Sequence, residues 1–305
     1  MAVFFAPMEG LTDSVYRLTH HSHFPGLDGY YMPFLSPTVH RCLTPREARE
    51  LPRADSVPFR TVPQLMTKVP EDFLWAAGVC RDLGYEEVNL NLGCPSGTVT
   101  AKGKGSGMLR DPESLETFLD GIFAASPLPI SLKTRLGYAD PEEFPRLLDI
   151  FNQYPVRRLI IHPRVRQQFY DGAVHMEAFR YAVDNTRIPL CYNGDLNSLA
   201  DLEAFRAAFP QIPDVMLGRG LIADPGMLIP GGTTADALGA FMDDLFLQYR
   251  VVFGSSRNAM FRLKENWRLI LKTHPVPEKL QKKLLKTTDE VEYRTITRLL
   301  LKEIL

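Results

Sequence analysis

The sequence has few cysteines, and none of them are paired by spacing. Its four cysteines, Cys42, Cys80, Cys94 and Cys191, are scattered over 305 residues without a Cys-x-x-Cys pair. This pattern argues against a structural zinc site and against a disulfide framework, and it fits a reducing compartment. We therefore expect no bound metal and a cytoplasmic protein.

Long hydrophobic runs and an excess of one charge are also lacking. No segment approaches the roughly 20 apolar residues of a membrane span. The N-terminal run 1–7 has no basic leader and is too short for a signal peptide. The net charge is −1 and the pI is about 6.7, so any contact with nucleic acid would need a local basic patch. We expect a soluble protein with no membrane partner, and a monomer.

Short apolar runs alternate with longer helical patterns, which indicates a parallel β/α fold. The expected strands lie near residues 3–7, 29–32, 61–65, 87–92, 129–134, 158–162, 189–193 and 214–217. The expected helices cover residues 72–83, 112–125, 141–153 and 198–209. Eight strands within about 220 residues match the usual size of a (β/α)₈ TIM barrel. A doubly wound sheet is less favoured, because no Gly-x-Gly-x-x-Gly follows the first strand.

The pattern changes at the Pro-Gly-Gly turn of residues 230–232, and only helical periodicity follows it. We predict a TIM-barrel domain over 1–232 and a small all-helical domain over 233–305. Thr233 or Thr234 is expected to cap the first helix of the second domain. A capping box at 287–290 is expected to open its last helix, with Val291 and Leu299 among the residues on the apolar side.

The predicted helical domain is basic, although the whole chain is not. From Phe241 onward it contains 13 Lys/Arg and 8 Asp/Glu, a net charge of +5. Such a segregation suits a helical module that faces phosphate groups. A solvated helix surface is the other interpretation and is the usual meaning of a charge run.

A cysteine follows the buried strand expected at 87–92, within the turn Gly93-Cys94-Pro95. The next segment, 96–107, contains four glycines and is expected to be mobile. A cysteine that opens such a loop can reach a bound ligand, and the loop can close over a site. The alternative is a small buried hydrophobic residue at a turn, and the spacing alone does not decide between them.

In a barrel, the chemistry is located at the carboxyl ends of the strands. The side chains expected there are Glu9, Gln64, Asn91, Cys94, Lys133, Arg135, His162, Arg164, Asn193, Asp195 and Arg219. Burying Lys133 or Arg135 without an anionic partner would be costly. Gly218-Arg219-Gly220 beside Asn193-Gly194 is suited to phosphate binding. Each residue alone could be structural, for example Gln64 as a loop cap, but their coincidence at successive strand ends favours a site.

The motifs at these positions make a family resemblance specific. In order, they are APMEGLTD at 6–13, QL at 64–65, NLGCPSGTV at 91–99, GKGSGMLRDP at 103–112, KTRLG at 133–137, HPR at 162–164, NGD at 193–195 and GRG at 218–220. In these motifs and their spacing the sequence resembles the tRNA-dihydrouridine synthases. The resemblance covers the barrel throughout, and the helical tail resembles the tRNA-binding domain of that family more loosely.

The resemblance implies FMN as cofactor, NADPH as electron donor and tRNA as the substrate. It implies that Pro7, Met8 and Glu9 contact the flavin ring through their backbone and that Gln64 bonds its polar edge. Lys133 would lie by the pyrimidine part of the ring, where a positive charge favours the anionic reduced flavin. His162 would contact the flavin or its ribityl chain. The ribityl chain and phosphate would be bound by Asn193, Gly194, Asp195, Gly218 and Arg219.

For the substrate, the resemblance implies hydride transfer to carbon 6 of a flipped-out uracil, with Cys94 protonating carbon 5 from the opposite face. Asn91 and Arg135 would bond the uracil carbonyls. Arg164 is a third expected substrate-binding residue, although His-Pro-Arg stands here where many relatives have His-Gly-Arg. Pro163 therefore stiffens a turn that glycine usually forms.

Two other interpretations share part of this pattern. An FMN barrel that acts on a small molecule, such as a dihydroorotate or enoate oxidoreductase, would use the same flavin residues but would not need a basic helical appendix. A non-catalytic, flavin-bound RNA-binding module is the second alternative. The intact Cys94 and Lys133 argue against it.

Overall fold

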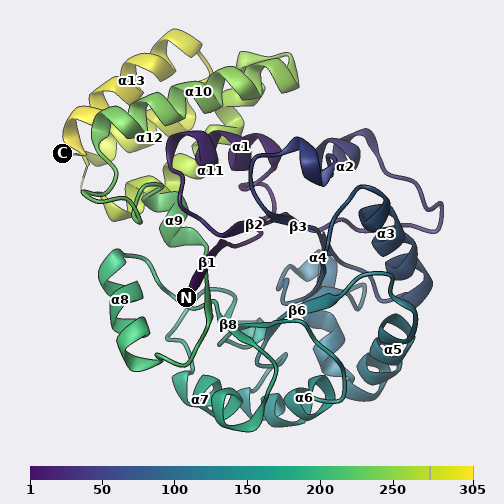
Figure 1. The fold of residues 1–305 in the computed structure, drawn as a ribbon. Coiled ribbons are helices and arrows are strands. Elements are labelled where there is room, and N and C mark those ends of the chain that lie inside the picture. The colour runs from purple at the N-terminus through teal and green to yellow at the C-terminus, as the bar shows by residue number, and fades with distance from the viewer. Residues whose placement is uncertain (275, 305) are drawn as a thin grey trace. The chain divides into compact units, whose positions relative to one another are not determined.

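A parallel sheet of nine strands forms the centre of the fold in the computed structural model, which describes residues 1–274 and 276–304. The strands are β1 (Ala2–Phe5), β2 (Gly29–Tyr31), β3 (Thr61–Val62), β4 (Gln64–Leu65), β5 (Val88–Leu92), β6 (Ile130–Arg135), β7 (Leu159–His162), β8 (Leu190–Tyr192) and β9 (Asp214–Leu217). Their order is β3-β2-β1-β9-β8-β7-β6-β5-β4, and in Figure 1 they surround a central space. The predicted TIM barrel is confirmed.

The strand expected at 61–65 is divided in two by a proline. Pro63 separates β3, which pairs with β2, from β4, which pairs with β5. Proline has no N–H to donate to a ladder, but its carbonyl oxygen still accepts a hydrogen bond from Asn89 N at 2.8 Å. The divided strand is therefore the one that closes the ring, and the nine strands occupy eight positions of a barrel.

Thirteen helices are present among the described residues. They are α1 (Ser14–His23), α2 (Pro45–Glu50), α3 (Pro70–Asp82), α4 (Gly97–Thr100), α5 (Pro112–Ala125), α6 (Phe144–Phe151), α7 (Met176–Asn185), α8 (Leu199–Ala208), α9 (Arg219–Ala223), α10 (Ala235–Phe253), α11 (Ser256–Thr273), α12 (Glu278–Lys286) and α13 (Glu290–Glu303). None of the described helices has both the length and the hydropathy to cross a bilayer.

The four helices predicted between the strands are present, and α1, α2, α4 and α7 are additional. The helix α5 begins at Pro112, as predicted from the sequence. Proline is favoured in the first turn, and Asp111 Oδ1 caps the helix by accepting a hydrogen bond from Ser114 N at 3.1 Å. The helix expected over 141–153 is divided into a 3₁₀ turn, η3 (Pro141–Glu143), and α6. Pro145 lies in the first turn of α6 and has no N–H to continue the preceding turn.

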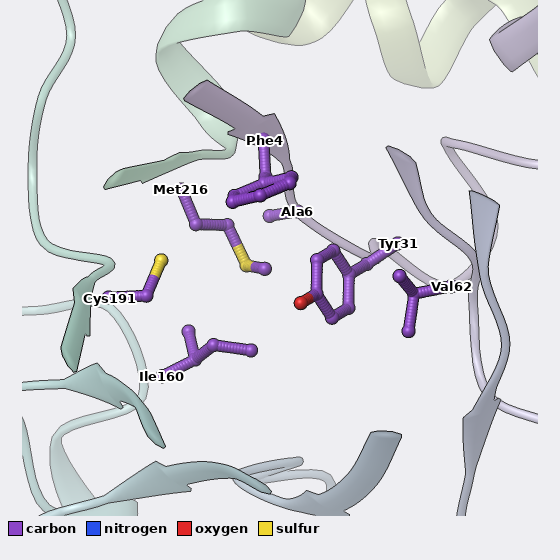
Figure 2. Close-up of a cluster of buried hydrophobic side chains, with 7 residues drawn as sticks. All are labelled: Phe4, Ala6, Tyr31, Val62, Ile160, Cys191 and Met216. Atoms are coloured by element: carbon purple, nitrogen blue, oxygen red, sulfur yellow. The ribbon is translucent and has the colours of Figure 1, made fainter. Parts of the chain in front are cut away.

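The interior of the barrel has an apolar side and a polar side. The apolar side consists of Phe4, Ala6, Tyr31, Val62, Ile160, Cys191 and Met216, which gather in the close-up of Figure 2 and are each at most 4% exposed. The polar side comes from β4, β5 and β6, where Gln64, Asn89 and Ser131 lie opposite one another in register. These three side chains are buried, so they need partners within the protein.

The chain divides into two compact units. The first comprises Met1–Pro7, Asp28–Asp195 and Arg206–Met216, and the second comprises Met8–Leu27, Leu196–Phe205 and the residues from Leu217 onward. The predicted boundary between 232 and 233 assigned α1 and α9 to the barrel. Their contacts instead group α1 with α10 and α9 with α11.

Asp13 joins three elements of the second unit. Its Oδ1 caps α1 by accepting a hydrogen bond from Tyr16 N at 3.1 Å, and the same oxygen accepts one from the Tyr249 hydroxyl of α10 at 2.8 Å. Its other oxygen lies 3.2 Å from Arg262 Nη2 of α11. Burial and the charge of Asp13 raise the pKa of Tyr249 well above its ordinary value. Arg262, one of the cations of the basic segment, therefore has a structural role.

The start of α10 agrees with the sequence, whereas that of α13 does not. Thr234 caps α10 by accepting a hydrogen bond from Ala237 N at 3.2 Å. For α13 the N-cap is Asp289, whose Oδ1 accepts from Glu292 N at 2.7 Å, so the cap lies two residues after the predicted Thr287.

The apolar face of α13 also differs from the prediction. Its buried side chains are Tyr293, Ile296, Thr297 and Leu300, which are spaced at three and four residues. This periodicity turns Val291 and Leu299 to the other face, where they are 74% and 45% exposed. The prediction that these two residues lie on the buried side is wrong.

A buried carboxylate organises the amino ends of the strands. Glu87, directly before β5, is 2% exposed and lies 2.7 Å from Arg60, 3.1 Å from Arg157 and 3.6 Å from Arg158. Arg158 also lies 2.5 Å from Asp214 at the start of β9. These charged residues are at the end of the barrel opposite the strand ends that carry chemistry, where a role in stability is expected.

Replacing Glu87 should destabilise the barrel strongly. Glu87→Ala leaves three guanidinium groups around an empty position, and breaking a buried ion pair in this way costs about 3–5 kcal/mol. Urea unfolding should show this loss in the free energy of unfolding. Asp55→Ala is the control, because Asp55 pairs with Arg53 on the surface, where both side chains are more than half exposed. Equal stability of the two variants would contradict the assignment.

Candidate active site at the carboxyl ends of the strands

Cys94 is held in place through its backbone on both sides. Asn91 Oδ1 accepts hydrogen bonds from Gly93 N at 3.0 Å and from Cys94 N at 2.9 Å. The carbonyl oxygen of Cys94 accepts from Ser106 N at 3.2 Å and from Ser106 Oγ at 2.7 Å. The turn after β5 is therefore closed by two side chains, and this fixes the position from which the thiol can act.

A chain of side-chain hydrogen bonds leads from the polar side of the barrel to this turn. Asn89 Nδ2 donates to Ser131 Oγ at 2.9 Å, Gln64 Nε2 donates to Asn89 Oδ1 at 2.7 Å, and Asn91 Nδ2 donates to Gln64 Oε1 at 2.8 Å. Each link uses a donor of one residue and an acceptor of the next. Asn89 and Ser131 were missed in the sequence, although the alternation of Asn89 and Asn91 in a buried strand was a usable signal.

The four cysteines differ in their surroundings. Cys42 is exposed, Cys94 is half-buried, and Cys80 and Cys191 are buried; none of the four is in a disulfide. Burial raises the pKa of Cys80 to about 12 and that of Cys191 further. Among the residues that the structure describes, no cluster of His, Cys, Asp or Glu could bind a metal ion.

The glycine-rich segment after Cys94 is folded into two short helical turns, α4 and the 3₁₀ turn η2 (Gly105–Arg110). Gly105 has a φ of +57°, and a Cβ there would lie 3.0 Å from the Cβ of Cys94. A Cβ on Gly107 would lie 2.8 Å from the carbonyl oxygen of Thr100. The segment was predicted as a mobile run. In the structure its glycines allow close packing against the Cys94 turn.

Lys133 lies on β6 opposite Asn91 and is half-buried without an ion-pair partner among the described residues. Burial and the nearby Arg135 lower the pKa of Lys133 to about 8, while the thiols of Cys191 and Cys94 act in the opposite direction. A lysine in this state gains from an anionic ligand, because the ligand would offset the cost of its buried charge.

Arg135, at the end of the same strand, connects two loops. Its Nε donates to the carbonyl oxygen of Gly93 at 2.9 Å, and Nη1 donates to that of Val165 at 3.0 Å. Its guanidinium carbon lies 5.5 Å from the centroid of the Tyr170 ring, and the residue is 1% exposed. Arg135 therefore joins the Cys94 turn to the segment after β7.

Arg164 is fully engaged by neighbouring groups. It forms a bidentate ion pair with Asp195, with Nη1 3.0 Å from Oδ1, and its Nε and Nη2 donate to the carbonyl oxygen of Gly172 at 3.2 and 2.6 Å. Its Nη1 also lies 3.1 Å from His162 Nε2. Because arginine only donates, this His162 nitrogen is the acceptor and the ring proton of the neutral form is on Nδ1.

Asn193 and Gly194 follow β8 in an arrangement that leaves no room for a further side chain. Asn193 Nδ2 donates to the carbonyl oxygen of Met216 at 2.7 Å. A Cβ on Gly194 would lie 1.9 Å from the Tyr192 hydroxyl oxygen, so only glycine fits beside that tyrosine. The backbone at this point is thus fixed by the residues around it.

The remaining predicted residues are Pro7, at the end of the first unit's initial segment, and Met8, Glu9, Gly218 and Arg219, which belong to the second unit. Met8 N donates a hydrogen bond to Thr12 Oγ1 at 2.9 Å, within a turn that also contains Gly10 at a φ of +76°. Gly218 is the N-cap of α9, and Leu221 N donates to its carbonyl oxygen at 3.1 Å. The convergence of these residues with the barrel residues on a flavin stays a prediction.

The pKa of Lys133 predicts a specific pH dependence of stability. Between pH 8 and the ordinary value of 10.5, the unfolded chain holds the Lys133 proton and the native protein releases it, so the contribution of Lys133 to stability rises with pH. The difference in free energy of unfolding between the flavin-free parent and Lys133→Met should therefore grow in favour of the parent across this range. Urea unfolding at several pH values measures it, with Lys302→Met controlling for the loss of an exposed lysine. Parallel curves for parent and Lys133→Met would contradict the burial of this charge.

The model of the family described as "Dihydrouridine synthase (Dus)" matches residues 4–239. The chain is 26% identical over 224 residues to tRNA-dihydrouridine synthase B of Pasteurella multocida, covering 73% of this chain and 66% of that protein. It is 30% identical over 227 residues to the probable tRNA-dihydrouridine synthase 1 of Synechocystis, covering 72% and 61%. The chain thus spans somewhat less than two thirds of the length of these relatives.

Solved structures of a similar fold include a 2-naphthoyl-CoA reductase complex, with a TM-score of 0.55 at 11% identity over 73% of this chain and 48% of that one. Another is a morphinone reductase variant in complex with tetrahydroNAD, with a TM-score of 0.52 at 11% identity over 74% of this chain and 85% of that one. At this identity the likeness shows the barrel alone. The family match extends over most of the sequence and includes the Cys94 turn, the end of β1 and all of β2 to β9. The chain therefore belongs to the dihydrouridine synthase family.

Proposed function

We propose that this protein reduces uridine to 5,6-dihydrouridine in tRNA, as a monomer, with FMN as cofactor and NADPH as the source of electrons. The observation that carries the proposal is the Cys94 turn. A half-buried thiol is fixed through Asn91 at the polar side of the barrel, within electrostatic range of Lys133. The family match supports the same chemistry.

The residues of the barrel fit a flavin by their chemistry. Lys133 lacks an anionic partner among the described residues, and an anionic ring would provide one. Gln64 uses one N–H and one lone pair within the protein, so each end of its amide retains capacity for one more hydrogen bond. Asn193, Gly194 and Asp195 would bind the ribityl chain, and Gly218 and Arg219 the phosphate, with Pro7, Met8, Glu9 and His162 contacting the ring or its chain.

When bound, the reduced flavin would supply a hydride to carbon 6 of the uracil. The base must leave its stack to reach the site. Cys94, as a thiol, would give a proton to carbon 5 from the opposite face. A weak acid suits this step, because the proton is needed only as negative charge develops on the base.

Asn91 and Arg135 are proposed to act partly through Cys94. The Asn91 amide already bonds Gln64, Gly93 and Cys94, so its principal role would be to fix the thiol. Arg135 bonds the carbonyl oxygen of Gly93 and would polarise the uracil from a position set by that bond. A substrate contact by Arg164 would require it to exchange partners, so we propose that it positions His162 and Asp195.

The exposed cations of the second unit are proposed to bind tRNA phosphates. Lys282 lies 2.7 Å from Glu278, and Lys283 lies 3.5 Å from Glu292, so these two are neutralised within the protein. Other exposed cations have no carboxylate partner within the described part of the chain: Lys272, Lys279, Lys286, Arg298 and Lys302. The unpaired set is the one available to phosphate groups.

Cys94→Ala should retain bound flavin and tRNA affinity but lose turnover by about 10²- to 10⁴-fold, because it removes only the proton donor. Flavin absorbance, a tRNA binding curve and the rate of dihydrouridine formation measure the three properties. Cys42→Ala, which changes an exposed thiol, should behave as the parent. Loss of flavin from Cys94→Ala, or an unchanged rate, would contradict the role of Cys94.

Neutralising unpaired cations should weaken tRNA binding more than neutralising paired ones. Lys286→Gln with Arg298→Gln should lower the affinity for unmodified tRNA and reduce the slope of log K against log salt by up to about 2, one for each lost phosphate contact. Lys282→Gln with Lys283→Gln removes the same charge from two ion pairs and should have a smaller effect. Affinities equal to the parent for both pairs would favour an FMN barrel that acts on a small molecule.

A further inference from the structure

Phe169 adopts a backbone conformation that is unusual for a bulky residue. It ends the 3₁₀ turn η4 (Arg166–Gln168) with φ of 50° and ψ of −98°, in the region that favours glycine. Its ring is nevertheless 41% exposed to solvent. Both the strained backbone and the exposed ring cost free energy in the isolated protein. Such features cluster at sites where a ligand is bound.

The Phe169 ring is connected to the Cys94 turn by one arginine. The guanidinium carbon of Arg166 lies 4.9 Å from the centroid of the Phe169 ring, and its Nε donates to the carbonyl oxygen of Pro95 at 3.1 Å. Its Nη2 lies 3.4 Å from Thr100 Oγ1 in α4. Pro95 directly follows Cys94, so the ring is fixed to the segment that carries the thiol.

Arg166 and a second cation, Arg110, both lie beside a further ring, that of Tyr138. Arg166 also lies 5.3 Å from the centroid of the Tyr138 ring, and Arg110 lies 3.8 Å from the same centroid. Within the described residues, neither Arg110 nor Arg166 has a carboxylate in ion-pair distance. The surface therefore combines exposed aromatic area with positive charge, which matches a polyanion that carries flat rings.

The next residue, Tyr170, contacts one residue proposed to bind the flavin and one proposed to bind the uracil. Tyr170 is 45% exposed, stacks on His162 with ring centroids 5.9 Å apart, and has Arg135 5.5 Å from its centroid. Two consecutive exposed rings thus contact different residues at the carboxyl ends of the strands. Tyr170 contacts His162 and Arg135, and Phe169 is linked through Arg166 to the Cys94 turn. A base bound at the first would have a neighbouring nucleotide near the second.

We propose that Phe169, held by Arg166, is a stacking platform for the nucleotide adjacent to the target uridine, and that Arg166 and Arg110 contact its phosphates. The proposal rests on the proposed function of the site. An aromatic ring stacks on any base, so the platform would hold unstacked single-stranded RNA without selecting its sequence. The strained backbone would keep the ring exposed when RNA is not bound.

Phe169→Gly separates binding from folding, because glycine adopts the local φ without strain. The variant should keep its bound flavin and have a Tm no lower than that of the parent. Its Kd for an unmodified tRNA transcript should rise by about 5- to 150-fold, the range for loss of one base-stacking contact. Tyr181→Ala is the matched control, since it removes another exposed ring, on the outer helix α7, and should leave the Kd unchanged.

A second measurement uses oligouridine of about nine nucleotides, a length within the range of single-strand binding sites, with or without abasic positions on both sides of the central uridine. The parent should lose affinity for the abasic probe, and Phe169→Gly should bind both probes equally weakly. Equal affinity of the parent for both probes, or an unchanged Kd for Phe169→Gly, would overturn the proposal. The rate of dihydrouridine formation by the parent reports separately on the proposed function, so the failure of one is distinguishable from the failure of the other.

Discussion

The position of Cys94 depends on a continuous set of amide and hydroxyl hydrogen bonds inside the barrel. From Ser131 through Asn89, Gln64 and Asn91, each side chain is oriented by the one before it, and the last accepts from the backbone of Cys94. A buried polar group without a partner would destabilise the fold, so the loss of any one of these hydrogen bonds would weaken the others. The stability of this side of the barrel and the orientation of the thiol therefore have the same physical origin.

The two ends of the barrel use charge differently. At the amino ends of the strands, Glu87 and Asp214 neutralise Arg158, whose side chain is only 12% exposed. At the carboxyl ends, Lys133 has no such carboxylate within the described residues, and burial together with the nearby Arg135 lowers its pKa. The charges at the amino ends are thus neutralised within the protein, whereas at the carboxyl ends a bound anion would stabilise the charge of Lys133.

Strand positions and the barrel could be predicted because apolar runs of strand length, bounded by turn residues, recur through the sequence. The hydrogen-bond partners at the carboxyl ends of the strands could not be predicted. Whether Asn91 faces a substrate or its own backbone depends on the register of β4, β5 and β6, which no local pattern encodes. Phe169 was missed for a related reason: an exposed ring in a polar segment has no periodicity, and its positive φ is visible only in coordinates.

The division of one strand at Pro63 makes the closure of the barrel unequal around its circumference. The strands β5 and β6 share five residues in register, whereas each half of the divided strand shares two with its neighbour, as do β1 with β2 and β8 with β9. What distinguishes this seam is Pro63 itself, which has no N–H to donate to the ladder. Gln64 directly follows Pro63, and its side-chain amide orients Asn91. Local separation of β4 from β5 would therefore also release Asn91. The position of the Cys94 thiol would therefore depend on whether the barrel is closed at Pro63.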